Sequence, residues 1–233
     1  MTPPPAELLI GSLKVPLIWR TSPRARRLSA RLDPKKRALI VSCPPHYPQQ
    51  AALAFLQTQQ KWILERFQKL SSQTISFAHE GIVPIEGKPY TITHQPNARS
   101  GVWVDGDTLC VSGQSEFIAR RVIDFLKKRA RTLLTQELHH AAHAAALRPS
   151  KLDIRDTASR WGSCNSAGRI MLSWRLVMAP LPVRHYLIAH ELAHLKHMNH
   201  SPAFWAYTDH LTPYRQQAEA WLKLYGPALL GAQ

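Results

Sequence analysis

Two histidines four residues apart, His190 and His194, constrain this 233-residue chain more than any other feature. Residues four apart on an α-helix lie on one face, so both imidazoles can bind the same metal ion. Glu191 follows the first histidine, where its carboxylate can reach a water on that metal. This H-E-x-x-H pattern on a helix is typical of zinc hydrolases. The sequence therefore predicts a metal site on a helix that runs from about Val183 onward.

A catalytic zinc site needs a third protein ligand and leaves its fourth position to water. His197 lies on roughly the same helical face, but at ~1.5 Å per residue it stands roughly 7–8 Å beyond the ion along the axis. His200 can return to the metal if the helix ends first, and Asn199 tolerates the left-handed conformation that ends helices. The spacing from His194 to His200 equals that of the metzincin pattern, although His197 takes the place of its glycine. We therefore predict His200 as the third ligand.

Each predicted site residue has an expected role in hydrolysis. Zinc lowers the pKa of its water towards ~7, and Glu191 would act as general base by accepting the proton. Asp209 is a candidate for orienting a ligand histidine from behind. A donor for the developing oxyanion is also needed, and the sequence leaves five candidates open. They are Arg160, Arg175, Tyr207, His210 and Tyr214.

The chain is strongly basic, with a formal net charge of +15. Such an excess favours polyanionic partners, so nucleotides or nucleic acid stand beside peptides and proteins as candidate partners. Part of the excess lies in one cluster near the N-terminus, for which a solvated sheet face is the alternative interpretation. The cluster comprises Arg20, Arg24, Arg26, Arg27, Arg31, Lys35, Lys36 and Arg37.

Nothing in the sequence predicts a membrane or secreted protein. No stretch approaches 18 uninterrupted apolar residues, and Met1–Ile10 lacks the basic-then-apolar order of a secretory signal. Cys43, Cys110 and Cys164 are too few and too widely spaced for a disulfide framework. A reducing, cytoplasmic location is therefore expected.

Hydrophobic periodicity predicts an α+β protein. The predicted strands cover residues 14–20, 27–32, 38–42, 89–94, 101–104, 108–111 and 151–156. The predicted helices cover residues 49–70, 115–147, 183 onward, 202–210 and 213–225, and a β-hairpin of residues 159–164 and 169–175 precedes the metal helix. We expect a β-rich region at 1–113, with one helix, and a catalytic region at 114–233. The two would pack as one compact unit.

Several segments together resemble the YgjP-like metallopeptidase family, which is related to SprT-like zincins. The resemblance covers nearly the whole chain and is strongest over residues 150–205. It implies a zincin-like α+β catalytic region, zinc at His190, His194 and His200, and Glu191 as catalytic base. The segments are Ser159–Cys164, Leu172–Leu176, Ala189–Leu195, Asn199–Pro202 with Phe204 and Trp205, Ser22–Arg27 and Pro44–Pro45.

The leading functional interpretation is a zinc-dependent hydrolase, most simply a metallopeptidase. One alternative is a metal-dependent nucleotide phosphohydrolase of the pyrophosphatase type, and another is a protease acting on nucleic-acid-associated proteins. In zincins an edge strand beside the metal helix can bind a peptide by strand addition, and residues 169–175 are the candidate strand. A shielding role for this strand is the other possibility.

Overall fold

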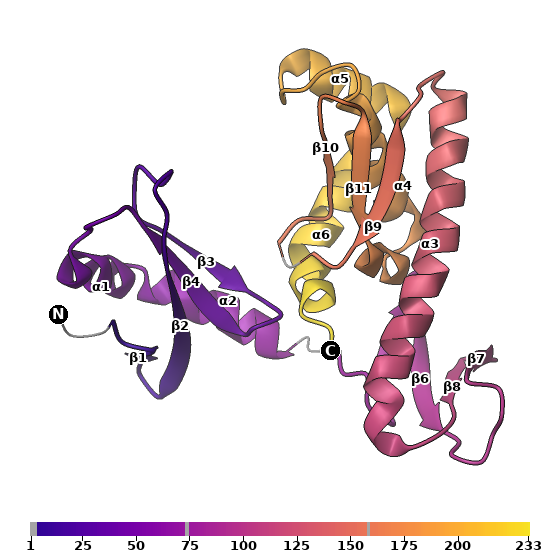
Figure 1. Cartoon of the computed structure of the whole chain (residues 1–233), viewed down its shortest axis with the longest axis horizontal. Coiled ribbons are helices and arrows are strands. Elements are labelled where there is room, and N and C mark those ends of the chain that lie inside the picture. Colours follow the sequence, from indigo (N-terminus) through magenta and orange to yellow (C-terminus); the bar gives the residue numbers. More distant parts are fainter. Residues whose placement is uncertain (1–3, 73–74, 158) are drawn as a thin grey trace. The chain divides into compact units, whose positions relative to one another are not determined.

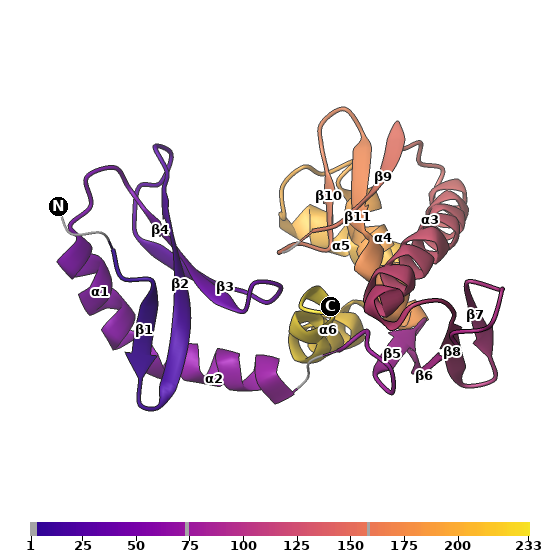
Figure 2. The same cartoon turned by 60° about the horizontal axis from the view of Figure 1, so that its bottom comes forward.

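A computed structural model describes residues 4–72, 75–157 and 159–233, apart from three side chains near residue 70. The chain divides into two compact units, Met1–Thr74 and Ile75–Gln233, and each has its own hydrophobic core. Figures 1 and 2 give the arrangement of elements within each unit. This division differs from the boundary expected at 113/114. The reason is that Val83, Ile92 and Leu109 belong to the same core as Val122 and Leu126.

Unit 1 is a mixed sheet covered by two helices on one face (Figure 2). Its strands are β1 (Glu7–Ile10), β2 (Leu13–Thr21), β3 (Ser29–Asp33) and β4 (Ala38–Cys43), in the order β1-β2-β4-β3. The central pair, β2 and β4, is parallel, and the outer pairs are antiparallel. The helices are α1 (Gln49–Thr58) and α2 (Gln60–Ser72). The single helix predicted over 49–70 is interrupted at Gln59, whose N–H donates to Leu56 O at 3.1 Å.

Unit 2 begins with a sheet of the same topology. Its strands are β5 (Ile82–Ile85), β6 (Lys88–His94), β7 (Val102–Asp105) and β8 (Thr108–Val111), in the order β5-β6-β8-β7 with β6 and β8 parallel. The 3₁₀ turn η1 (Ser115–Phe117) leads into α3 (Ile118–Ala144). Helix α3 runs the length of the unit, from this sheet to the next one (Figure 1). Its buried residues recur every fourth position: Ile118, Val122, Leu126, Ala130, Leu134, Leu138 and Ala142.

The second sheet of unit 2 lies beside the predicted metal helix. Its strands are β9 (Lys151–Arg155), β10 (Gly162–Cys164) and β11 (Arg169–Ser173), in the order β10-β11-β9. Strands β10 and β11 form the predicted hairpin. The expectation that residues 169–175 form an edge strand is wrong, because β11 is bonded on both sides and Trp174 already belongs to a 3₁₀ turn. The remaining elements are η2 (Trp174–Met178), α4 (Leu181–Ala193), α5 (Pro202–Leu211) and α6 (Arg215–Leu230).

Two buried arginines fix the segment that enters α4. The Arg184 guanidinium donates to the Glu137 carboxylate of α3 at 2.7–3.1 Å and to Ala179 O at 2.6 Å. The Arg175 guanidinium on η2 pairs with Asp156 at 2.6 Å and donates to the carbonyls of residues 230 and 232 at 3.2 Å. A buried guanidinium needs partners for all its donors, so these bonds leave α4 few alternative positions.

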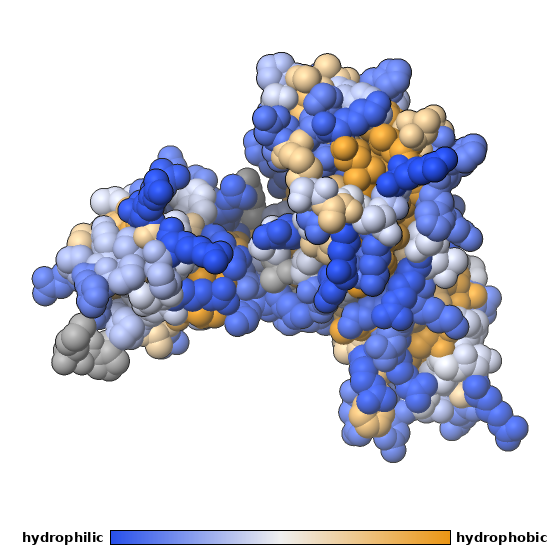
Figure 3. Space-filling view, turned by 45° about the horizontal axis from the view of Figure 1, so that its top comes forward, coloured by the Kyte–Doolittle hydropathy of each residue, from blue (hydrophilic) through white to orange (hydrophobic). Residues whose placement is uncertain are grey.

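Among the described residues, none of the helices has the length and apolar character that crossing a bilayer requires. Hydrophilic side chains cover most of the face in Figure 3, with hydrophobic ones gathered in patches. Cys43, Cys110 and Cys164 are free thiols.

Candidate metal centre

Three histidines meet at the end of α4. His190 lies on its last turn, His194 follows its last residue, and His200 lies on the loop before α5. One ring nitrogen from each lies within 4.8 Å of the others, a grouping that could hold a metal ion. The Nε2 atoms of His190 and His200 are 3.2 Å apart. The structure therefore brings together the three histidines singled out in the sequence.

The chain reverses direction between the second and third histidines. Helix α4 ends at Ala193, and the following N–H groups of Leu195 and Lys196 donate to carbonyls three residues back, at 3.0 and 3.1 Å. The expectation that Asn199 ends the helix in a left-handed conformation is wrong, because the helix ends earlier and Asn199 has no positive φ. Tightened i→i−3 bonds end the last turn instead.

His197 contacts the cluster through its backbone carbonyl. Its carbonyl oxygen lies 3.0 Å from Nδ1 of His194. A carbonyl only accepts, so Nδ1 carries the proton and the His194 Nε2 lone pair is available to a metal. The His197 ring lies beside Tyr207, with centroids 6.0 Å apart. A carbonyl partner that fixes the tautomer of a metal-binding histidine is a common arrangement in metal sites.

The ring of Phe204 packs against all three histidines of the cluster. Phe204 is fully buried, and its ring centroid lies 4.6–5.0 Å from those of all three histidines. Ser201 caps α5 by accepting from the Phe204 N–H at 3.4 Å. In the sequence, Phe204 belonged only to the segments that resemble the family, and no role at the metal site was predicted for it. Its packing depends on where α5 returns to α4, which no local pattern specifies.

Glu191 is packed against the edge strand. Its side chain is 4% exposed, and a Cβ built on Gly162 of β10 would lie 2.3 Å from Oε1. Only glycine leaves room for this carboxylate. Within the described part of the chain, Oε2 of Glu191 and Nδ1 of His190 are buried without a hydrogen-bond partner. Burial raises the pKa of Glu191 to about 8, and the charge of Arg160 partly opposes that rise.

The surroundings of His190 and His194 favour the neutral form of both imidazoles. Burial, together with the smaller effects of the neighbouring His194 and His200, lowers the pKa of His190 to about 4. The pKa of His194 is lowered by burial and by His200, against the opposing effect of the His197 carbonyl. Metals bind the neutral form of imidazole, so the site is prepared for a cation.

The model of the YgjP-like family, described as a metallopeptidase domain, matches residues 26–225. The chain belongs to the YgjP-like family. Neither the search of curated proteins nor the search of solved structures found a match. Family membership supports a metal-dependent hydrolase with, in general, a protein or peptide substrate.

In this YgjP-like protein, the five candidates for stabilising the oxyanion lie in different surroundings. Arg160 is the cation that acts on Glu191, whereas Arg175 is buried and paired with Asp156. Tyr207 lies between His197 and Lys196. Asp209 binds Arg215 at 2.5 and 2.8 Å, so the expectation that it orients a ligand histidine is wrong.

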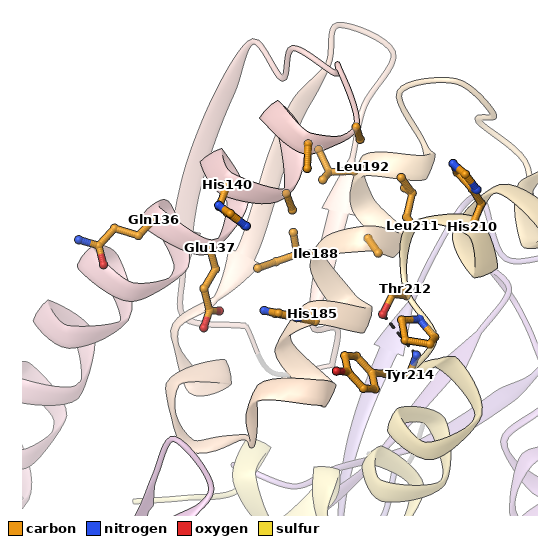
Figure 4. Close-up of a pocket in the computed structure, with 15 residues that line it drawn as sticks. Gln136, Glu137, His140, His185, Ile188, Leu192, His210, Leu211, Thr212 and Tyr214 are labelled. Carbon is orange, nitrogen blue, oxygen red and sulfur yellow. Dashed lines mark hydrogen bonds between the residues drawn. The ribbon is translucent and has the colours of Figure 1, made fainter.

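The other two candidates, His210 and Tyr214, line a separate cavity of about 550 Å³ (Figure 4). This cavity lies between α3, α4 and the segment after α5. Ile188 and Leu192 face it from α4. Each precedes a cluster histidine by two residues, about 200° around the helix, so the cavity and the histidines occupy opposite faces of α4.

Proposed function

We propose that this YgjP-like protein is a zinc-dependent peptidase. Zinc would be held by His190, His194 and His200, and Glu191 would be the general base. The observation that supports this proposal is the meeting of three imidazoles at the end of α4, beside the buried carboxylate of Glu191.

The donor set fits zinc. Three imidazole nitrogens are a common protein ligand set of catalytic zinc. Two nitrogens that are each about 2.0–2.1 Å from a tetrahedral ion lie roughly 3.4 Å apart. The 3.2 Å between Nε2 of His190 and of His200 is close to that value.

The chemistry divides between the ion and the chain. Zinc, when bound, supplies Lewis acidity and makes water acidic near neutral pH. Oε2 of Glu191, buried without a protein partner, accepts the proton of the attacking water and passes it to the leaving amine. The positive charge of a bound zinc ion would favour the ionised form of this carboxylate against the effect of burial. Arg160 is the candidate for stabilising negative charge on the substrate oxygen.

Strand β10 is the proposed binding edge for the peptide. It occupies one edge of its sheet in the described structure, and its Gly162 contacts Glu191. An extended peptide that pairs with this edge would bring a carbonyl beside the carboxylate. β10 therefore replaces the strand at residues 169–175 as the candidate. Because the cysteines are free thiols, we also propose a reducing, cytoplasmic location.

Metal analysis and a substrate screen test the proposal. The purified protein should hold about one zinc per chain, and His200→Ala should lose it. Glu191→Gln should keep the zinc and cleave no member of a peptide library. Stoichiometric zinc in His200→Ala would contradict the ligand assignment. Hydrolysis of nucleoside triphosphates without peptide cleavage would reject the peptidase in favour of a phosphohydrolase.

A further inference from the structure

The positive charge of the protein is concentrated in unit 1. Residues 1–74 contain twelve of the 30 lysines and arginines but only three of the 15 acidic residues, a net charge of +9 out of +15. Nine of these cations lie within residues 14–37, and every one of the nine is exposed. They are Lys14, Arg20, Arg24, Arg26, Arg27, Arg31, Lys35, Lys36 and Arg37.

Sheet register places several arginines together. Arg20 lies opposite Ser42, and Arg31 lies opposite Ile40, on the face that alternates with the core residues Trp19 and Val41. These arginines therefore point away from α1 and α2. The connection over residues 22–28 carries three more arginines past the ends of β2 and β4, where the Ser22 N–H donates to Cys43 O at 3.0 Å. Those three are Arg24, Arg26 and Arg27.

An aromatic cavity of about 440 Å³ opens at the same end of the sheet. Trp19, Arg20, His46 and Tyr47 are among the residues that line it. The Trp19 indole is held in place because Nε1 donates to Pro5 O at 2.7 Å. Tyr47 is 37% exposed, so its ring is accessible. Cys43 also lines this cavity, so the cavity lies at the end of the sheet where the arginine-bearing connection over residues 22–28 begins.

We propose that unit 1 binds single-stranded nucleic acid. The backbone phosphates would lie on Arg24, Arg26 and Arg27, and an unpaired base would enter the cavity against Tyr47 and Trp19. Proteins that bind single strands combine a positive groove with aromatic side chains on which bases stack. An anionic membrane would use the charge but not a recessed aromatic cavity, and paired bases could not enter it. This proposal is independent of the proposed peptidase activity.

Fluorescence anisotropy of the full-length protein with a labelled 20-nucleotide oligouridine, from 50 to 300 mM KCl, tests the electrostatic part. The triple variant Arg24→Ala/Arg26→Ala/Arg27→Ala should bind at least about tenfold more weakly at 100 mM, and its log–log salt slope should fall by about 2. A matched control removes three exposed cations of unit 2. This control, Lys128→Ala/Arg131→Ala/Arg148→Ala, should bind within about twofold of the parent.

The aromatic part is tested by a pair of substitutions at one position. Tyr47→Ala should weaken binding about tenfold, whereas Tyr47→Phe should keep it, because a phenyl ring still stacks on a base. Thermal melting shows that each variant is folded. Equal losses in the two triple variants, or in the two Tyr47 variants, would overturn the proposal. Binding to phosphatidylserine vesicles without oligouridine binding at 50 mM KCl would overturn it in favour of a membrane surface.

Discussion

At the scale of single residues, Gly162 and Glu191 depend on each other although they are far apart in the sequence. The glycine has no positive φ, so backbone conformation does not require it. It is required because any Cβ would occupy the place of the Glu191 carboxylate. The H-E-x-x-H pattern predicted Glu191 as the general base, but it could not predict that its carboxylate packs against Gly162.

The first prediction concerns this contact. Gly162→Ala should lower kcat/KM for peptide cleavage by about 100-fold, because displacing a catalytic group by about 1 Å has effects of that size. Zinc content should be unchanged, since the three histidines are untouched. The neighbouring Ser163→Ala is the control and should keep most of the activity. An active Gly162→Ala enzyme would mean that the position of Glu191 is not critical.

A second prediction follows from the pKa of Glu191, which burial raises from 4.5 to about 8 in the folded, metal-free protein. A carboxyl with a raised folded pKa favours folding below its unfolded pKa, and this contribution is lost as pH rises towards 8. Glu191→Gln cannot ionise. After chelation, the variant should therefore gain stability over the parent, on the order of a few kcal/mol, between pH 5 and pH 8. Urea unfolding at both pH values measures the difference, and a constant difference would contradict it.

At the scale of elements, periodicity predicted most strands and helices but not their partners. The structure has strands at three predicted segments, residues 89–94, 101–104 and 108–111. No local pattern reveals that the two four-stranded sheets share one strand order, in which a parallel central pair is flanked by an antiparallel strand on each side. Strand order arises from contacts between distant residues. The same reason explains the wrong edge strand, since β11 becomes central only when β9 joins it from before the hairpin.

The third prediction concerns the ion pair that joins α3 to α4. Arg184 is 2% exposed, so Glu137→Gln should leave its charge without a full partner and lower the free energy of unfolding by about 3 kcal/mol. The exposed pair of Arg129 and Glu86 offers a matched control. There, Glu86→Gln should change stability by less than about 1 kcal/mol. Equal midpoints of urea unfolding for the two variants would contradict the buried-pair argument.

At the scale of the whole molecule, the division into two units was not apparent from the sequence. The β-rich composition continues across residue 75, so a boundary after the last strand was the natural expectation. Burial decides otherwise, because β5–β8 share their core with α3 and the metal helix. The three candidate ligands, Phe204 and Glu191 all belong to unit 2.

The fourth prediction is that residues 75–233, expressed alone, fold and bind zinc. Every residue of the larger core cluster comes from this range, so the fragment contains the whole of that cluster. The fragment should melt cooperatively and hold about one zinc per chain, whereas oligouridine binding should be lost. An unfolded fragment, judged by circular dichroism, would contradict the independence of its core.

The last residues of unit 2 have a further consequence. The Phe77 N–H donates to Gln233 O at 2.8 Å, and the Gln233 N–H donates to Ile75 O at 3.2 Å. The segment before β5 therefore lies beside the segment that follows α6. That second segment also supplies the carbonyls of residues 230 and 232 to the buried Arg175 guanidinium on η2, which leads into the metal helix. Removing residues 230–233 would leave Arg175 with Asp156 alone among these partners, so the placement of the histidine cluster depends on a segment far from it in the sequence.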